Sequence, residues 1–216
     1  MKPSVFYLHG FTSSPRSTKA NFLADKLMGH GIALRCPDFN LPDFRTMTMT
    51  RMLAQLSDEL AVTGPAPVTL IGSSLGGTLA ILGAARFADR VDRVVLMAPA
   101  VMFAKPGHHL LPPERIEEWR RRGSLPFFHY GENEERPLDY TFYDDSLAYD
   151  AFSTRLTQPT LIYQGMRDTS VDPRTVEQFA NAHPNVTLSL LEDDHQLTAS
   201  LPLMWSGIQA FLDLLD

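Results

Sequence analysis

The sequence predicts an α/β protein with a mostly parallel central sheet of about six or seven strands and helices on both faces. Short apolar runs rich in β-branched residues alternate with segments of helical periodicity, which is the pattern of a covered parallel sheet. A glycine-flanked serine follows one of these runs directly, as at a sharp strand-to-helix turn. The length of 216 residues, with 44% hydrophobic and 20% charged residues, suits a single folded domain over 1–216.

Strand-like and helical segments follow one another along most of the chain. Strands are expected at 4–9, 32–36, 67–72, 93–98, 159–164 and 186–191. Helices are expected at 17–29 and 47–60, where apolar residues recur at helical spacing. A further helix at 76–87 is rich in small residues, which would let it pack closely on the sheet behind a sharp turn. The small residues meant are Gly77, Ala80, Gly83 and Ala84.

The interval 101–158 interrupts this alternation and is expected to be a small cap inserted into the domain. It is longer than an ordinary crossover between parallel strands. A helix is predicted over 113–122, because prolines open it and Gly123 can end it. The other expected elements are two strands of a hairpin and a short helix, at 127–130, 138–142 and 144–152.

Aromatic residues are concentrated in this insertion. They could cover a binding pocket or form a small core of the insertion itself, and the sequence favours neither reading over the other. The residues are Trp119, Phe127, Phe128, Tyr130, Tyr140, Phe142, Tyr143, Tyr149 and Phe152.

The composition argues against several kinds of partner. A net charge of −6 disfavours binding to nucleic acid and attraction to an anionic membrane surface. The basic run 120–122 follows two glutamates on a predicted helix, so we interpret it as a solvated helix end. No apolar run is long enough to span a bilayer. The sequence leaves the oligomeric state open.

Cysteine usage and the first residues bear on the compartment. Cys36 is the single cysteine, so it cannot form an internal disulfide, and its strand-like surroundings predict a reduced thiol in the core. Residues 1–3 lead directly into a strand without the apolar segment of a signal peptide. Together these observations favour a cytoplasmic protein.

The segment 72–76 reads Gly-Ser-Ser-Leu-Gly and matches the G-x-S-x-G nucleophile elbow. In this turn the two glycines avoid collisions with neighbouring backbone, and the serine between them is exposed at the carboxyl end of a strand. Ser74 has a glycine two positions before it and another two positions after it, whereas Ser73 does not. Ser74 is therefore the predicted nucleophile.

A serine hydroxyl needs a histidine to take its proton and a carboxylate to orient that histidine. In chain order the acid and then the base should follow later strands, and Asp168 and His195 stand in those places. Asp172 precedes Pro173, so we expect it to cap a helix instead. The other histidines considered lie in a helix end, the insertion and the first loop; they are His183, the pair His108–His109, and His9.

Acyl transfer also needs two backbone N–H groups that stabilise the developing oxyanion. Leu75 directly follows the nucleophile and should supply one of them. Phe11, in the loop after the first strand, should supply the other. His9 lies in that loop, and we expect it to hold the loop by hydrogen bonding. Neither a metal nor another cofactor is expected, because no ligand set or phosphate-binding loop has the required spacing.

With these residues identified, the chain resembles the α/β-hydrolases over nearly its whole length. The motifs are the HGF loop, the GSSLGG elbow, the GMRD acid loop and the DDH segment. YLHGFTSSPRSTKA, LIGSSLGG and HYGENEE are similar to the small bacterial YqiA-type esterases. The resemblance implies Ser74 as nucleophile, Asp168 as acid and His195 as base.

The expected function is a serine carboxylic-ester hydrolase that acts on a small soluble acyl ester through an acyl-serine intermediate. Phe11 and Leu75 should line a pocket for an apolar acyl chain of modest length. A thioesterase is an alternative, because the catalytic residues do not encode the leaving group. An acyltransferase or a carbon–carbon hydrolase on the same fold is another, and a non-catalytic binding protein is a third.

Overall fold

Six parallel strands form the framework of the protein, as the sequence predicts. The computed structural model describes residues 4–105, 107–108 and 111–214. The order of the six strands across the sheet is β2-β1-β3-β4-β7-β8, and every adjacent pair is parallel. The strands are β1 (Ser4–Leu8), β2 (Leu34–Arg35), β3 (Val68–Ser73), β4 (Val91–Met97), β7 (Thr160–Gly165) and β8 (Val186–Leu191). The observed strand β2 is shorter than the strand expected at 32–36.

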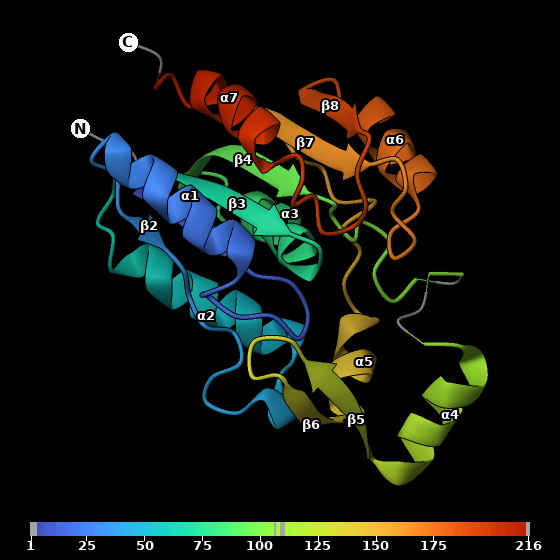
Figure 1. The fold of residues 1–216 in the computed structure, drawn as a ribbon. Coiled ribbons are helices and arrows are strands. Elements are labelled where there is room, and N and C mark those ends of the chain that lie inside the picture. Colours follow the sequence, from blue (N-terminus) through green and yellow to red (C-terminus); the bar gives the residue numbers. More distant parts are fainter. Residues whose placement is uncertain (1–3, 106, 109–110, 215–216) are drawn as a thin grey trace.

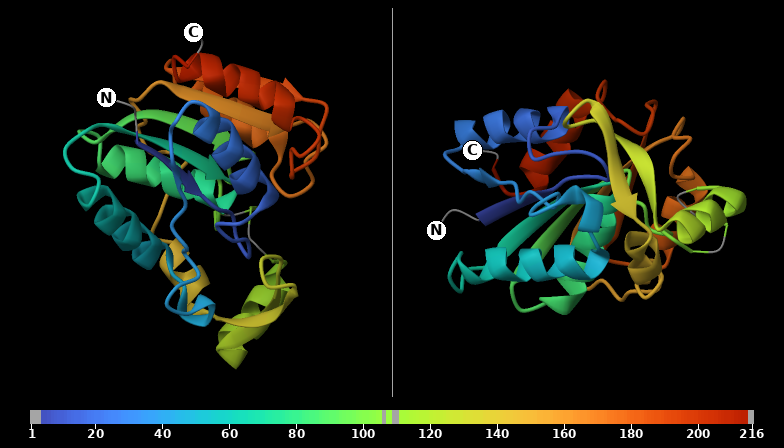
Figure 2. Two further views of the ribbon diagram at one scale, coloured as in Figure 1. Left: turned by 60° about the vertical axis from the view of Figure 1, so that its left-hand side comes forward. Right: turned by 90° about the horizontal axis from the view of Figure 1, so that it is seen from below.

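Helices cover both faces of this sheet (Figures 1 and 2). One face carries α1 (Thr18–Gly29) and α7 (Leu201–Phe211). The other carries α2 (Met49–Ala61), α3 (Leu75–Arg86) and α6 (Pro173–Asn181). No helix in the described part of the chain has both the length and the apolar character needed to cross a membrane.

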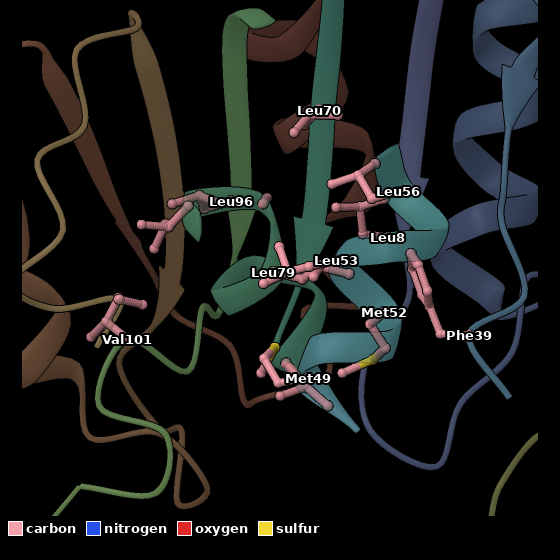
Figure 3. Close-up of a cluster of buried hydrophobic side chains, with 14 of the residues drawn as sticks. Leu8, Phe39, Met49, Met52, Leu53, Leu56, Leu70, Leu79, Leu96 and Val101 are labelled. Carbon is pink, nitrogen blue, oxygen red and sulfur yellow. The ribbon is translucent and has the colours of Figure 1, made fainter. Parts of the chain in front are cut away.

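The two faces divide the core because neighbouring residues of a strand point in opposite directions. In β1, Val5 and Tyr7 pack beneath α1 and α7, whereas Phe6 and Leu8 pack against α2 and α3. Figure 3 shows the second cluster, in which leucines and methionines of α2 meet β3 and α3. At the contact of the two helices, a Cβ on Gly83 would lie 2.6 Å from Leu56 Cδ2, so the predicted packing role of this glycine is confirmed.

Local capping explains where the helices begin and end. The Ser17 hydroxyl accepts a hydrogen bond from the Ala20 N–H at the start of α1. Thr48 caps α2 through the Arg51 N–H in the same way. Gly123 ends α4 (Pro113–Arg122) with φ 77°, a left-handed conformation that favours glycine.

The insertion departs from the prediction at its second half. The hairpin strands are β5 (Ser124–His129) and β6 (Glu134–Asp139), and a six-residue helix α5 (Thr141–Ser146) follows at once. The expected strand at 138–142 and the expected helix at 144–152 were therefore both placed too late in the chain. The reason is that Tyr140 has helical backbone angles, and its N–H donates to the Gly123 carbonyl.

Most aromatic side chains of the insertion belong to the core rather than to a pocket. Trp119 and Phe142 are both 0% exposed and join the cluster beneath α2 and α3. The Trp119 indole N–H donates to the Leu138 carbonyl at 2.8 Å, which fastens α4 to the hairpin. The insertion (Figures 1 and 2) is thus packed against the rest of the protein through a shared core.

We predict that Leu56→Ala lowers the free energy of unfolding by about 2–5 kcal/mol. Leu56 is 0% exposed and fills the space beside Gly83, so truncation removes buried surface and leaves a cavity. Urea unfolding followed by circular dichroism measures the change. The matched control is Val62→Ala at the end of the same helix, which is 71% exposed and should change stability by less than about 0.5 kcal/mol.

Candidate active site

Ser74 stands in a sharp turn between β3 and α3. Its backbone angles are φ 54° and ψ −118°, a strained conformation for a residue other than glycine. A Cβ on Gly72 would lie 2.3 Å from the Gly76 carbonyl oxygen, and one on Gly76 would lie 2.0 Å from the Leu8 carbonyl oxygen. Both contacts are prohibitive, so the turn requires glycine at the two positions where the motif has it.

The structure brings the three predicted polar side chains together. The His195 Nε2 atom lies 3.1 Å from Ser74 Oγ, and His195 Nδ1 lies 2.8 Å from Asp168 Oδ2. The three residues follow the carboxyl ends of β3, β7 and β8. Because all strands of the sheet are parallel, these ends lie at one edge, which is why residues so distant in sequence meet.

The Asp168 carboxylate is fully hydrogen-bonded. Its Oδ1 accepts the backbone N–H groups of Ser170 and Val171, each at 2.8 Å. Its Oδ2 accepts from Gln164 Nε2 at 2.9 Å as well as from His195. Burial alone would raise the pKa of Asp168, but the hydrogen bonds from His195, Val171 and Gln164 outweigh burial and lower that pKa. An ionised Asp168 makes Nδ1 the protonated nitrogen of the imidazole and leaves Nε2 free to accept from Ser74.

The loops that carry Asp168 and His195 are joined to each other through their backbones. The Arg167 N–H donates to the Asp193 carbonyl at 3.0 Å. A Cβ on Gly165 would lie 2.5 Å from the same carbonyl oxygen, so glycine is needed where the loops cross. The Asp193 carboxylate in turn accepts the Ser200 N–H at 2.9 Å, just before α7. Backbone contacts thereby fix the spacing between acid and base.

The loop after β1 passes close to Ser74. A Cβ on Gly10 would lie 3.3 Å from Ser74 Cβ. Within the described part of the chain, the N–H groups of Phe11 and Leu75 have no hydrogen-bond partner. His9 shapes this loop: its Nδ1–H donates to the Gly10 carbonyl at 3.0 Å, and its Nε2 accepts the Phe39 N–H at 3.1 Å.

The hairpin of the insertion is tied to this same loop. The Tyr130 N–H donates to the Thr12 carbonyl at 2.8 Å. A Cβ on Gly131 would lie 2.8 Å from Ser14 Cβ, so the tip of the hairpin rests directly on the chain next to Phe11. The insertion and the loop after β1 therefore hold each other in place.

The competing candidates occupy other positions. Asp172 caps α6, as predicted, by accepting the Arg174 N–H at 3.0 Å. Ser73 is buried beside Tyr7, where burial raises the tyrosine pKa to about 12 against the effect of hydrogen bonds with Ser17 and Ser73. His183 contacts the carbonyls of Phe179 and Thr154. His108 lines the cavity that contains Ser74, and His109 lies outside the described residues.

A cavity of about 1150 Å³ opens onto Ser74 and His195. Its apolar lining includes Phe11, Leu75, Met102, Phe103 and Val171. Its polar lining includes Ser13, Ser14, Arg16, Ser17, Thr18 and Lys19, which form a nearly continuous stretch. Phe11 and Leu75 line the cavity as expected. Of the nine aromatic residues of the insertion considered for a pocket or a core, Tyr130 alone lines this cavity, and Phe103 adds a further aromatic side chain from the insertion.

Sequence reasoning overlooks two side chains that support the site. Gln164 is 0% exposed at the end of β7, and its Nε2 donates to Asp168. Lys19 is 8% exposed and donates to the Gln196 carbonyl beside His195. Signals for both exist: a polar residue in an otherwise apolar strand run, and a lysine on the same helix face as Leu23 and Leu27.

The chain is similar to known proteins in both sequence and fold. The sequence pattern of the Uncharacterised protein family (UPF0227) matches residues 4–212. The mitochondrial palmitoyl-protein thioesterase ABHD10 of Rattus norvegicus is 25% identical to this chain over an aligned length of 231 residues. The alignment covers 99% of this chain and 76% of that protein. A solved structure from Agrobacterium vitis S4 is 25% identical with a TM-score of 0.84, and the match covers 98% of this chain and 88% of that one. The mouse alpha/beta hydrolase domain-containing protein 10 is 22% identical with a TM-score of 0.81, over 100% and 92% of the two chains.

We predict that Asp168→Asn lowers the free energy of unfolding by about 1–3 kcal/mol near neutral pH, because an NH2 group replaces one of the two oxygens that accept hydrogen bonds. The pKa of Asp168 is lower in the folded protein than in the unfolded chain. Its contribution is therefore present above the unfolded pKa and is lost as the pH falls through the folded pKa.

Urea unfolding of both proteins, from neutral pH down to the lowest pH at which both still fold, measures this difference. The difference between them should shrink on acidification. Asp89→Asn is the control, because Asp89 is exposed and its carboxylate has no hydrogen-bond partner among the described residues. A gap that stays constant with pH would contradict the predicted ionisation of Asp168.

Proposed function

The chain belongs to the Uncharacterised protein family (UPF0227) and has the α/β-hydrolase fold, and we propose that it is a serine hydrolase that cleaves small carboxylic esters. The observation that carries this proposal is the continuous hydrogen-bonded line from Ser74 through His195 to Asp168, with contacts of 3.1 and 2.8 Å. An ionised Asp168, hydrogen-bonded on both oxygens, gives the imidazole the orientation that a general base requires.

In the first half of the reaction, His195 Nε2 takes the proton of Ser74 as its Oγ attacks the ester carbonyl. The new oxyanion is placed to receive hydrogen bonds from the unpartnered N–H groups of Phe11 and Leu75. Collapse of this intermediate breaks the bond to the leaving alcohol, which takes the proton from His195. The acyl group remains on Ser74 as an ester.

In the second half, water replaces the alcohol. His195 takes a proton from the water as its oxygen attacks the acyl-Ser74 carbonyl. The bond to Ser74 Oγ then breaks, the proton returns to Ser74, and the carboxylic acid leaves.

The cavity supports a substrate with an apolar part and a polar part. Phe11, Met102 and Phe103 offer apolar surface beside Ser74, which suits an acyl chain. Serine and threonine side chains also line the cavity, which suits a polar leaving group. In this proposal the insertion 101–158 acts as a cap, because Phe103 and Tyr130 border the cavity from that segment.

A thioester is the second candidate substrate. The observation that favours it is the 25% identity to a palmitoyl-protein thioesterase along 99% of this chain. The proposed mechanism applies unchanged, since a thiolate leaves more readily than an alkoxide and needs less help from His195. Comparing an oxygen ester and a thioester of one acyl group would show which leaving group the cavity prefers.

We predict that Ser74→Ala lowers kcat for short p-nitrophenyl esters by at least about a thousandfold, because the attacking atom is removed. Release of p-nitrophenol measures turnover, and circular dichroism checks that the fold is kept. A small fluorophosphonate should add once to the wild-type protein, at Ser74, as located by mass spectrometry of the peptides. Ser74→Ala retaining most of the activity would refute the assignment.

The two aspartates of the acid loop should separate clearly. We predict that Asp168→Asn lowers kcat by about a hundredfold or more, since the imidazole loses its orienting carboxylate. Asp172→Ala should leave kcat within about twofold and cost roughly 1 kcal/mol of stability, because Asp172 caps a helix and, although it lines the cavity, has no hydrogen bond to His195 or Ser74. The reverse ranking of the two variants in the p-nitrophenyl ester assay would make Asp172 the acid.

A further inference from the structure

Lys19 is a buried charge next to the base. It lies in the first turn of α1 with a residue exposure of 8%. Its Nζ donates to the carbonyl oxygen of Gln196 at 2.8 Å, directly after His195 in the chain. The side chain also borders the cavity that contains Ser74. A lysine in such a position costs free energy to bury, so its surroundings must offset that cost.

Carboxylates from two loops provide that offset. The Lys19 ammonium interacts with Asp168 from the loop after β7, and with Asp193 and Asp194 from the loop after β8. Burial lowers the pKa of Lys19 to about 8, although attraction to these three carboxylates acts in the opposite direction. Among the described residues, the other titratable groups that line the cavity are Tyr7, Arg16, His108, Tyr130, Asp172 and His195.

We propose that Lys19 is a positioning residue for the His195–Asp168 pair, holding the backbone after His195 and balancing the negative charge of the two loops. The inference rests on the proposed function, since it concerns the base of that reaction. The ammonium reaches the site from α1, whereas His195 and Asp168 follow β8 and β7. Lys19 thus connects α1 to the loop that carries His195, through its hydrogen bond to the Gln196 carbonyl. In this proposal the connection keeps the imidazole oriented toward Ser74.

Two consequences distinguish this role from mere packing. Without the ammonium, the Gln196 carbonyl loses its donor, and Asp168, Asp193 and Asp194 lose the electrostatic attraction of the ammonium, so the imidazole should be less well aligned. Since misalignment slows the chemical step, kcat should fall with little change in KM. The ammonium also loses its proton as the pH rises through about 8, so the rate should decline above that pH in the wild-type protein.

The experiment compares Lys19→Met and Lys19→Arg with the wild type, using a neutral p-nitrophenyl ester from about pH 6 to pH 10. Active sites are counted by fluorophosphonate labelling so that rates refer to folded, competent protein. Lys19→Met should lower kcat about ten- to a hundredfold and abolish the decline above pH 8. Lys19→Arg should keep kcat within about fivefold and move the decline beyond the measured range, because guanidinium stays charged. Lys26→Met, on the exposed side of the same helix, should match the wild type.

A second readout does not depend on turnover. The proton shared by His195 Nδ1 and Asp168 should give a low-field proton NMR resonance in the wild type and in Lys19→Arg, and this resonance should be broadened or lost in Lys19→Met. Its loss in a protein that hydrolyses no ester would overturn the proposed function while supporting the positioning role.

An unchanged kcat per active site in Lys19→Met, with the same decline above pH 8 and the same resonance, would overturn the role of Lys19. If Lys19→Met does not fold, Lys19→Arg decides the question. A decline above pH 8 that persists in Lys19→Arg would then refute the proposal.

Discussion

The close approach of α3 to β1 is the constraint on which the rest of this structure depends. Gly76 lies so near the Leu8 carbonyl that a single added carbon would come within 2.0 Å of it. This contact sets Ser74 at the tip of the turn and brings the loop after β1 beside it. The position of Ser74 determines which residues surround it: the cavity, the N–H groups of Phe11 and Leu75, and His195 all lie next to it. The strain at Ser74 is sustained by the buried strands on either side.

Backbone contacts, rather than long side chains, define most distances in the site. The loops after β7 and β8 cross at Gly165, and the Asp193 carboxylate links the second loop to the start of α7. Such contacts have little rotational freedom. The distance between Asp168 and His195 therefore varies less than the distance between two exposed side chains would. Gln164 then donates to the Asp168 carboxylate, and Lys19 donates to the Gln196 carbonyl next to His195.

The order of strands and helices could be predicted from the sequence because each has a local cause. The capping serine before α1, the glycine after α4 and the elbow glycines specify their own conformations. Three predictions failed or were imprecise where a tertiary contact decides. The strand at 32–36 pairs with β1 over two residues, and the hairpin ends early at Asp139. Cys36, expected in the core, is half-buried.

The candidate site divides in the same way. Ser74, Asp168 and His195 could be predicted because a motif and the chain order point to them. Gln164 and Lys19 could not be assigned in advance, because their partners are a carboxylate and a carbonyl that only folding brings near. The sequence also left open whether the aromatic residues of the insertion line a pocket or form a core. Folding decides this for Trp119 and Phe142, which are buried in the core shared between the insertion and α2.

The hydrogen bond from the Tyr130 N–H to the Thr12 carbonyl joins the insertion to the loop after β1, so the positions of these two segments depend on each other. Under the proposed function, a change in hairpin length or sequence would alter the donor geometry at Phe11 together with the width of the cavity. Substrate preference and catalytic rate would then be inherited jointly and could not be tuned one at a time. A cap borrowed from a relative would have to reproduce this contact before it could bring a new specificity with it.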